Sequence, residues 1–394
     1  MSTKQNSKIL LISPSEISKD PRVLAHIEVL KEFGEVISVG YGGQPPWVSR
    51  HISINKASKY LPTSVLGLIR VLVGSNLSAA KSTRFSRDVL ANTDVEVFEL
   101  VVANDVHSLA IAHEISQRSK ASLWVDMHEY APLEGEDDWR WRLLLKRYVS
   151  AVCREFLKLA DCVTTVGEAI RLKYEEDSGR EVQLLMNTAE YLPRRVEVDN
   201  PERENLTLIH VGVAIRARRL ENMIEAVKNL KGVSLDLLLL PTDGAYFNEI
   251  NERIASVENV KVLSPIATEN IAHFISHYDC GIVTIPPTSF NYANALPNKL
   301  FQYIQARLAV ITGPIPEVAR IVNDYGIGWV TRDFSPEEIR ITIESARDSG
   351  LAGVEQNLDK AALELSRENE NQIRKSIIRK LISIQNDREI KDSN

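Results

Sequence analysis

The sequence lacks the cysteine pairs that a disulfide framework or a structural zinc site would need. Its three cysteines, Cys153, Cys162 and Cys280, are an odd number and include no CxxC pair. No second histidine or cysteine lies at the spacing of metal ligands, so we expect no metal site. This cysteine usage is typical of a reducing compartment and predicts a cytoplasmic protein.

Long hydrophobic runs are also missing. Residues 1–12 carry only a short apolar run, which is shorter than the core of a signal peptide. The longest apolar stretch, at 66–73, is interrupted by Arg70 and is too short to span a bilayer. We therefore expect that no segment crosses a membrane.

Three motifs of common enzyme classes are absent: GxSxG, the P-loop, and GxGxxG after a strand. Each of them places a nucleophile or a row of backbone N–H groups at a sharp turn, where the chemistry requires it. Their absence argues against a hydrolase, a nucleoside triphosphatase and a dehydrogenase.

Acidic residues are missing from the window 36–87, although the whole chain has a net charge of −6. The window carries +7, which leaves −13 for the rest of the chain. Its basic residues are Arg50, Lys56, Lys59, Arg70, Lys81, Arg84 and Arg87. A chain this acidic elsewhere is a poor nucleic-acid binder, because such binding needs a broad positive surface. Apolar residues interleave with the basic ones, which predicts peripheral contact with an anionic membrane; a solvated basic loop is the alternative.

Short apolar segments alternate with amphipathic helical patterns along the chain. Residues 8–13 (KILLIS) are typical of a buried parallel strand, and Asp20 with Pro21 predicts the start of a helix. Further strands are expected at 35–39, 97–103, 122–126, 162–166, 182–186, 206–211, 235–240, 260–263, 281–285, 309–312 and 328–331. Such alternation builds parallel sheets that helices cover on both faces.

A charged stretch with two prolines, residues 193–205, interrupts this alternation and predicts a linker. We therefore expect Rossmann-like domains at 1–192 and 206–365, and a final helix with a polar tail at 366–394 that returns toward the first domain. The expected fold is α/β, with two doubly wound parallel-sheet domains that face each other across a cleft. Open parallel sheets bind ligands beyond the carboxyl ends of their strands.

The segment 291–312 contains the most informative helix start. Pro297 is predicted as the first helical residue, and the uncharged loop 286–296 precedes it. The free N–H groups and the positive end of the dipole at such a start suit a pyrophosphate. Lys299 would add a positive charge and Gln302 would reach a ribose; a helix with an ordinary polar face is the alternative.

Three arginines, Arg216, Arg218 and Arg219, open the helix that follows the strand LTLIHVG. Positive charges at a helix start oppose its dipole and cost up to about 1 kcal/mol each, which a bound anion would offset. Plain solvation at the surface is the alternative.

Asp126, His128 and Glu129 cluster at the end of another expected strand, where α/β enzymes keep catalytic groups. We take them as candidate catalytic residues. A lone histidine is more often a structural hydrogen-bonding residue, which is the alternative for His128.

Several short motifs, in order and spacing, together resemble the GT-B glycosyltransferases, and within them the retaining family 4. They are Asp20-Pro21-Arg22-Val23, Asn104-Asp105, Asp126-Met127-His128-Glu129, residues 160–170 (ADCVTTVGEAI), Asn187, His210-Val211-Gly212, Arg218, residues 224–226 (IEA) and residues 296–303 (LPNKLFQY). The likeness runs over nearly the whole chain.

This resemblance implies a retaining enzyme that moves a sugar from a UDP- or GDP-linked donor to a glycan or lipid-linked acceptor, in the synthesis of a surface polysaccharide or glycolipid. It implies a donor site in the C-terminal domain, an acceptor site in the N-terminal domain, no metal or other cofactor, and a sugar-positioning role for His128. The implied donor-binding residues are Arg216, Arg218, Asn294, Leu296, Pro297, Asn298, Lys299 and Gln302. The basic residues of the window 36–87 would lie on the acceptor and membrane side.

Asn294 and Gln302 stand where the resembled family has two glutamates. A carboxylate accepts charge-assisted hydrogen bonds that an amide does not match. A GT-B protein that binds a carbohydrate or a partner without turnover is therefore the alternative function. A GT-B epimerase is disfavoured, because it would need acid/base carboxylates at these positions.

Overall fold

The computed structural model describes residues 7–136, 138–139, 141–194 and 205–392. The chain divides into two compact units: unit 1 comprises Met1–Met186 with Asn371–Asn394, and unit 2 comprises Asn187–Glu370. Most of the linker predicted at 193–205 lies outside the described residues. Among the described residues, no helix combines the length and the apolar character that crossing a bilayer requires.

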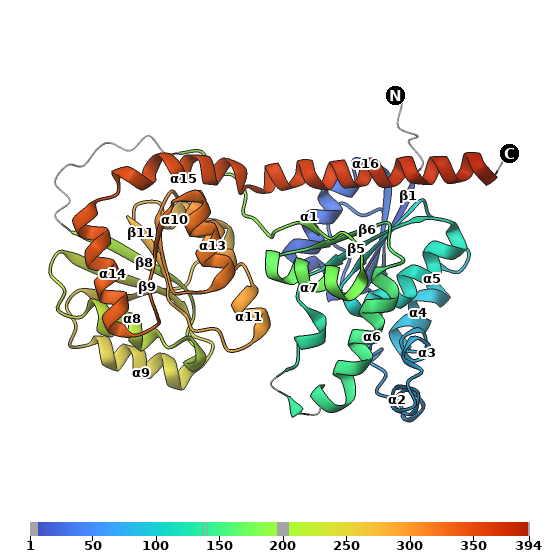
Figure 1. Cartoon of the computed structure of the whole chain (residues 1–394), viewed down its shortest axis with the longest axis horizontal. Coiled ribbons are helices and arrows are strands. Elements are labelled where there is room, and N and C mark those ends of the chain that lie inside the picture. Colours follow the sequence, from blue (N-terminus) through green and yellow to red (C-terminus); the bar gives the residue numbers. More distant parts are fainter. Residues whose placement is uncertain (1–6, 137, 140, 195–204, 393–394) are drawn as a thin grey trace. The chain divides into compact units, whose positions relative to one another are not determined.

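Unit 1 is built on a seven-stranded parallel sheet of order β3-β2-β1-β4-β5-β6-β7. Figure 1 labels β1, β5 and β6 of this sheet. Its strands are β1 (Lys8–Glu16), β2 (Glu35–Tyr41), β3 (Arg50–Ser53), β4 (Leu100–Asn104), β5 (Ser122–Met127), β6 (Cys162–Thr165) and β7 (Gln183–Leu184). In register, Leu10 of β1 lies between Ile37 of β2 and Val101 of β4. The chain first runs outward from β1 to β3 and then returns to β4 on the other side. The carboxyl ends of β1 and β4 are thus the switch point of this sheet.

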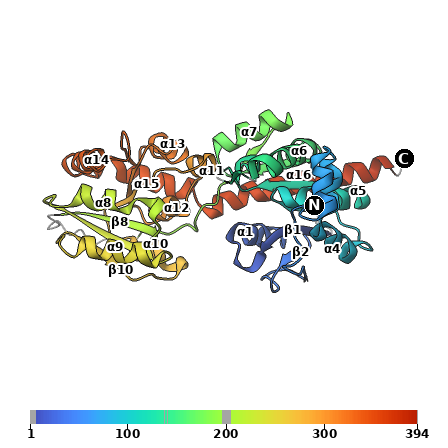
Figure 2. The ribbon, with the colours of Figure 1, turned by 90° about the horizontal axis from the view of Figure 1, so that it is seen from below.

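Helices cover both faces of this sheet. They are α1 (Pro21–Leu30), α2 (Val65–Leu72), α3 (Asn76–Lys81), α4 (Arg84–Thr93), α5 (Leu109–Ser119), α6 (Lys146–Leu157) and α7 (Glu168–Ser178), with the short turns η1 (Ile17–Lys19), η2 (Val106–Ser108), η3 (Ala131–Leu133) and the π-helical η4 (Trp141–Leu145). Asp20 caps α1 by accepting a hydrogen bond from the Val23 N–H at 3.2 Å, and Pro21 takes the first helical position. Figure 2 shows α1 and α6 on opposite sides of unit 1. Because both faces are covered, the strand residues 9–12 are fully buried.

The last helix, α16 (Arg367–Asp392), begins in unit 2 and continues over unit 1. Ile377, Ile378 and Leu381 share a core cluster with Val23 and Ile27 of α1. Ser122 also donates a hydrogen bond to the Leu381 carbonyl at 2.8 Å. The end of the chain is therefore an integral part of the first unit.

Unit 2 has a six-stranded parallel sheet of order β10-β9-β8-β11-β12-β13. Its strands are β8 (Leu206–Val213), β9 (Val233–Leu240), β10 (Val260–Leu263), β11 (Cys280–Val283), β12 (Ala309–Thr312) and β13 (Gly328–Val330). Its helices are η5 (Arg216–Arg218), α8 (Leu220–Val227), α9 (Gly244–Ile254), η6 (Thr268–Asn270), α10 (Ile271–Ile275), α11 (Phe290–Asn294), α12 (Asn298–Gln305), α13 (Pro316–Tyr325), α14 (Pro336–Ser349) and α15 (Ala352–Glu364). Helices α8, α9 and α14 share one core cluster with the sheet, through Met223, Tyr246 and Ile343. The switch point of this sheet lies at the carboxyl ends of β8 and β11.

The expectation of two doubly wound parallel sheets is confirmed, and every expected strand is present. Two elements differ from the predictions made on the sequence. β3 was not predicted, because its sequence RHIS has no apolar run. The segment 286–296, predicted as a loop, contains α11, which Ser289 caps by accepting from the Tyr292 N–H.

Candidate functional site

The switch point of unit 2 carries a pocket of about 240 Å³. Arg218 from η5, Pro297 from the start of α12 and Val283 from the end of β11 line it. Most of its other lining residues are apolar. Because these elements follow β8 and β11, the pocket lies at the edge of the sheet where such folds bind ligands.

Lys299 lies two residues after Pro297, and the charge of Arg218, which lines the pocket, acts on it. It is only 8% exposed, and its Nζ has no hydrogen-bond partner among the described residues. A Cβ atom added to Gly212 would lie 3.1 Å from this Nζ and 3.0 Å from Nε2 of His210. The ammonium and the imidazole therefore face the same small space, and the missing side chain of Gly212 leaves that space open.

His210 offers a hydrogen-bond acceptor to this space, whereas Lys299 offers donors. Its Nδ1 donates to the Ile282 carbonyl at 2.8 Å, and its Nε2 has no partner among the described residues. Burial, helped by the charge of Lys299, holds the pKa of His210 well below its ordinary value. The ring is therefore neutral, with Nε2 as an acceptor. A hydroxyl group can donate to this nitrogen while a neighbouring oxyanion binds Lys299.

Burial disfavours the charged form of the Lys299 side chain. Burial, with a contribution from the charge of Arg218, lowers the pKa of Lys299 from 10.5 to about 7. A buried ammonium without a partner is unfavourable unless an anion reaches it. A bound phosphate would restore the charge and pair it.

The two arginines of η5 point to different surroundings. Arg218 lines the pocket, whereas Arg216 donates to Glu249 of α9 at 2.7 Å and lies over the ring of Tyr246. Arg219 adopts the left-handed conformation, with a φ of 47°, and this turns the chain into α8. Of these two arginines only Arg218 lines this pocket, and the expectation that Arg216 also binds the donor stays a prediction.

Helix α12 begins one residue later than predicted, and Pro297 is its N-cap residue. No side chain caps this start. Asn298 is exposed and accepts a hydrogen bond from the Asn187 side chain at 3.3 Å. An uncapped helix start next to Arg218 is a favourable place for an anion.

The other expected donor-binding residues are mostly buried. Leu296 is buried beside Pro297, and Asn294 donates a side-chain hydrogen bond to the Phe290 carbonyl at 2.8 Å. Gln302, one turn into α12, is also buried. None of these three lines the pocket described above.

The switch point of unit 1 contains a buried network centred on Asp126. This aspartate is fully buried and accepts two hydrogen bonds from Arg22, each of 2.7 Å, from Nε and one terminal nitrogen. His26 lies 2.8 Å from the same carboxylate, and Thr164 donates to it at 2.5 Å. Burial opposes the charge of Asp126, but Arg22 and His26 hold its pKa well below the ordinary value. Asp126 is thus enclosed by Arg22, His26 and Thr164, and its place among the catalytic groups stays a prediction.

His128 lies between two carboxylates. Its Nδ1 is 3.3 Å from Asp105 and its Nε2 is 3.3 Å from Asp126, while its side chain is 21% exposed. Burial lowers the pKa of His128, but Asp105 and Asp126 outweigh this, and the net shift is upward. The ring therefore keeps its proton to a higher pH than an ordinary histidine does, and the imidazolium donates hydrogen bonds from both nitrogens.

Asp105 was named in the sequence motifs but not among the candidate site residues. Its φ is 63° and its ψ is 164°, a conformation that non-glycine residues rarely adopt. Its carboxylate also accepts a hydrogen bond from the His128 backbone N–H at 3.1 Å. The side chain of Glu129 is exposed to solvent. Loss of part of its hydration and the negative charge of Asp105 raise the pKa of Glu129. Asp105 thus fixes both the ring and the backbone of His128.

The basic residues of the window 36–87 fall into two groups. Arg50 pairs with Glu96, Lys56 lies 3.1 Å from Glu16, and Arg84 lies 4.0 Å from Asp88. The second group has no ion pair with any described side chain: Lys59, Arg70, Lys81 and Arg87. The structure therefore separates charges that are locally balanced from charges that are available to a ligand.

Two further features bear on the choice of site. Among the described residues, no group of three or more His, Cys, Asp or Glu side chains is arranged to hold a metal ion.

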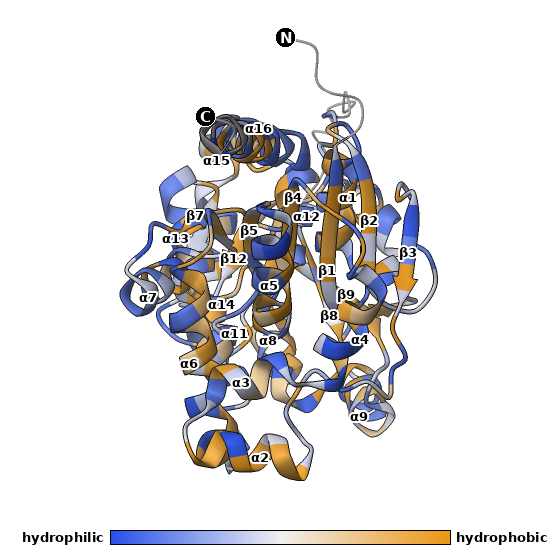
Figure 3. Cartoon of the chain, turned by 90° about the vertical axis from the view of Figure 1, so that its right-hand side faces the viewer, coloured by the Kyte–Doolittle hydropathy of each residue, from blue (hydrophilic) through white to orange (hydrophobic). Residues whose placement is uncertain are grey.

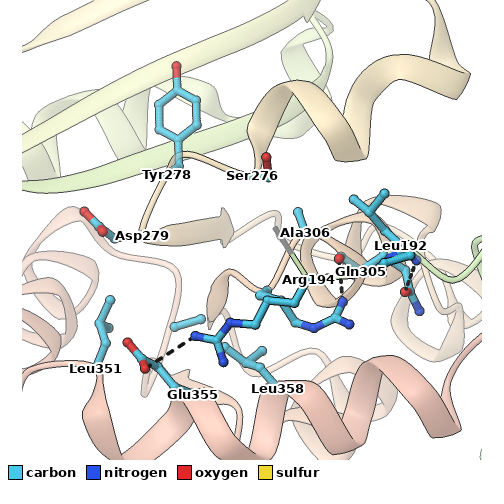
Figure 4. Close-up of a pocket in the computed structure, with 13 residues that line it drawn as sticks. Leu192, Arg194, Ser276, Tyr278, Asp279, Gln305, Ala306, Leu351, Glu355 and Leu358 are labelled. Atoms are coloured by element: carbon cyan, nitrogen blue, oxygen red, sulfur yellow. Dashed lines mark hydrogen bonds and ion pairs between the residues drawn. The ribbon is translucent and has the colours of Figure 1, made fainter. Parts of the chain in front are cut away.

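A pocket of about 90 Å³ at the amino ends of β11 and β12 contains Arg194, which lies 3.6 Å from Glu355 (Figure 4). Its position, at the edge of the sheet opposite the switch point, and its internally paired charges make it a poor candidate.

No family model matches the chain, and no curated protein matches it by sequence. Solved structures do match it. Sucrose-phosphate synthase from Thermosynechococcus elongatus is 14% identical with a TM-score of 0.69, over 96% of this chain and 100% of that one. Anabaena HepE in complex with UDP-glucose is 14% identical with a TM-score of 0.65, over 95% and 99%. A glycosyltransferase from Rickettsia africae is 13% identical with a TM-score of 0.67, over 96% and 99%. At these identities the likeness establishes architecture, and the chain has the two-domain α/β fold of the GT-B glycosyltransferases.

Proposed function

We propose that the chain is a glycosyltransferase that moves a sugar from a UDP- or GDP-linked donor to a glycan or lipid-linked acceptor. The observation that carries this proposal is the unpartnered ammonium of Lys299 beside Gly212. A folded protein gains nothing from burying this charge, so its retention points to an anionic ligand. Arg218 and the uncapped start of α12 add positive potential at the same edge of the sheet.

A nucleotide sugar matches the chemistry of this corner better than a simple anion. Its diphosphate would bind Lys299, Arg218 and the start of α12. One of its hydroxyl groups would donate to the neutral Nε2 of His210. Similar structures bind such ligands, since HepE has been solved with UDP-glucose and with UDP.

The reaction breaks the bond between the anomeric carbon of the sugar and the leaving diphosphate. Arg218, Lys299 and the helix dipole would stabilise the charge that develops on that leaving group, which is the role a metal ion plays in other transferases. We propose retention of configuration, in which a phosphate oxygen of the leaving group accepts the proton of the acceptor hydroxyl. His128, as an imidazolium, would position the sugar by donating a hydrogen bond, and Glu129 would lie beside it.

The remaining parts of the proposal concern the acceptor and the cell. Membership of the retaining family 4 and work in the synthesis of a surface polysaccharide or glycolipid follow from the sequence resemblance. A cytoplasmic location at the inner face of the membrane follows from the cysteine usage and the basic window 36–87. The basic residues of unit 1 without ion pairs support an anionic acceptor side.

A second function is favoured by one observation. Asn294 and Gln302 are buried amides at positions where the resembled family has carboxylates. A chain that binds a sugar nucleotide, a carbohydrate or a partner without turnover would tolerate this replacement. Release of UDP or GDP from the donor, measured with and without an acceptor glycan, separates this binding protein from an enzyme.

The donor site itself is tested by thermal unfolding in the presence of UDP- and GDP-sugars. A ligand at 100 times its dissociation constant should add about 2.7 kcal/mol to the stability of the protein. The variant Arg218→Met should lose most of this gain. Arg216→Met is a matched control, because Arg216 stands two residues away but pairs with Glu249. No stabilisation by any nucleotide sugar, or equal losses in both variants, would refute the proposed donor site.

A further inference from the structure

Helix α2 and the residue that follows it expose an apolar surface of unit 1. Val65, Leu66, Leu72 and Val73 are 76%, 62%, 71% and 70% exposed, and Ile69 is half exposed. Figure 3 shows α2 at the lower end of the view, with a largely hydrophobic ribbon. A contiguous apolar patch of this kind on a folded domain marks a surface that another apolar phase covers.

Helix α2 is well formed despite this exposure. Ser64 caps it by accepting a hydrogen bond from the Gly67 N–H at 3.1 Å. Gly67 and Val71 face inward, and a Cβ atom on Gly67 would lie 2.8 Å from the Pro62 carbonyl. The helix is thus held close to the underlying chain by its small face, and its large apolar side chains point outward.

The turn η4 extends the same surface. It lies against α2 and exposes Leu143, at 70%, and Leu144. Next to these leucines, Arg142, Lys146 and Arg147 are exposed. We call the exposed apolar residues of α2, of its C-cap position and of η4 the apolar tip: Val65, Leu66, Ile69, Leu72, Val73, Leu143 and Leu144.

A basic groove adjoins the apolar tip. Arg70 of α2, Lys81 of α3 and Arg87 of α4 line an open groove of about 640 Å³, together with the apolar side chains of Leu77 and Phe156. These three basic residues have no ion pair with a described side chain. The window 36–87, which supplies them, contains no acidic residue.

We propose that this face of unit 1 docks on an anionic phospholipid bilayer. The apolar tip would enter the region between headgroups and acyl chains, and the basic groove would hold lipid phosphate groups. Charge complementarity selects this partner: the chain has a net charge of −6, yet this face collects unpaired cations around an apolar centre. An amphipathic surface with this composition binds bilayers through buried apolar area and attraction to anionic headgroups.

The proposal is independent of the transferase function, since it rests on α2, α3, α4 and η4 alone. Cosedimentation of the full chain with vesicles tests it. We expect binding to vesicles that mix phosphatidylglycerol with phosphatidylcholine, weak binding to phosphatidylcholine alone, and a decline of binding with rising salt. Absence of binding to the mixed vesicles would overturn the proposal.

Two double variants distinguish binding by the basic groove from a general effect of the protein's net charge. The double variant Lys81→Gln with Arg87→Gln should weaken binding to mixed vesicles about 25-fold, at about fivefold per charge. Arg50→Gln with Lys56→Gln removes the same net charge from the same window, but these residues pair with Glu96 and Glu16, so binding should change little. Equal losses in both variants would show non-specific attraction and overturn the assigned surface.

The apolar tip is tested by Leu66→Ser with Leu72→Ser. Both residues are exposed, so the fold should persist, which circular dichroism checks. Binding to mixed vesicles should fall at least tenfold. If this variant binds as the unchanged chain does, the apolar tip plays no part and the docking proposal is wrong. If inorganic phosphate releases the protein at an ionic strength at which sodium chloride does not, the groove is a phosphate site and the proposal is also wrong.

Discussion

Replacement of Lys299 by methionine should stabilise the unliganded protein and remove its affinity for a nucleoside diphosphate. Methionine keeps the apolar length of the lysine stem and removes the ammonium, which has no partner in the described structure. Most substitutions of a fully buried residue destabilise a fold. A gain in stability would therefore show that the charge is kept for binding.

The magnitude follows from the lowered pKa. A shift of one pKa unit corresponds to about 1.4 kcal/mol, so the fall from 10.5 to about 7 represents on the order of 5 kcal/mol. Between pH 7 and 10.5 the unfolded chain binds more protons at Lys299 than the folded chain does, so stability rises with pH across this window. The variant should lose this dependence and gain most at pH 7 and below.

Calorimetry with UDP and with GDP provides the matching binding test. At pH 8 the unliganded Lys299 is mostly neutral, and a bound diphosphate would charge it, so about 0.9 proton should be taken up per ligand. The apparent heat should therefore change with the ionisation enthalpy of the buffer, and Kd should rise nearly tenfold per pH unit above pH 8. Lys231→Met, at an exposed position, is the control. Binding of UDP by Lys299→Met with unchanged affinity, or binding without proton uptake, would refute the reasoning.

Three further predictions address other residues. Asp126→Asn leaves the buried Arg22 charge without its counterion and should destabilise unit 1 by about 3–5 kcal/mol in urea unfolding, whereas a loss below about 1 kcal/mol would contradict the network. Transfer activity should fall as the pH rises through the raised pKa of His128, since the imidazolium is then lost, and a pH profile that is the same in His128→Gln would argue against this role. Gln302→Glu should tighten donor binding several-fold if this side chain reaches the ribose, and titration calorimetry would show no change if it does not.

Both parallel sheets could be predicted from the sequence, because most of their strands are apolar runs of the kind that a doubly covered sheet accommodates. The start of α1 was equally predictable, since Asp20 and Pro21 have one favourable arrangement there. β3 was missed for the opposite reason: its residues carry no apolar run, and its pairing with β2 decides its conformation.

The sites were harder to predict than the fold. Nothing in the letters of residues 216–219 tells which arginine faces the pocket, because the left-handed turn at Arg219 and the pairing with Glu249 decide it. His210 lies inside the apolar strand β8, and the sequence alone gives it no role beyond its place in a motif. Only the structure shows that its Nε2 has no partner among the described residues and lies near Gly212, as does the Nζ of Lys299. A histidine and a glycine two residues apart at the end of a buried strand were the available signal.

The two units use buried charge in opposite ways, and we base the roles we propose for them on this difference. At the switch point of unit 1, Asp126 and Arg22 pair through two hydrogen bonds, so the buried carboxylate has its counterion before any ligand arrives. At the switch point of unit 2, the Nζ of Lys299 has no hydrogen-bond partner in the part of the chain that the structure describes. A site whose charges are already paired positions a neutral group such as a sugar, whereas a site with an unpaired cation selects an anion. Unit 2 is therefore the half of the chain where we expect the diphosphate to bind, and unit 1 the half that positions the group being transferred.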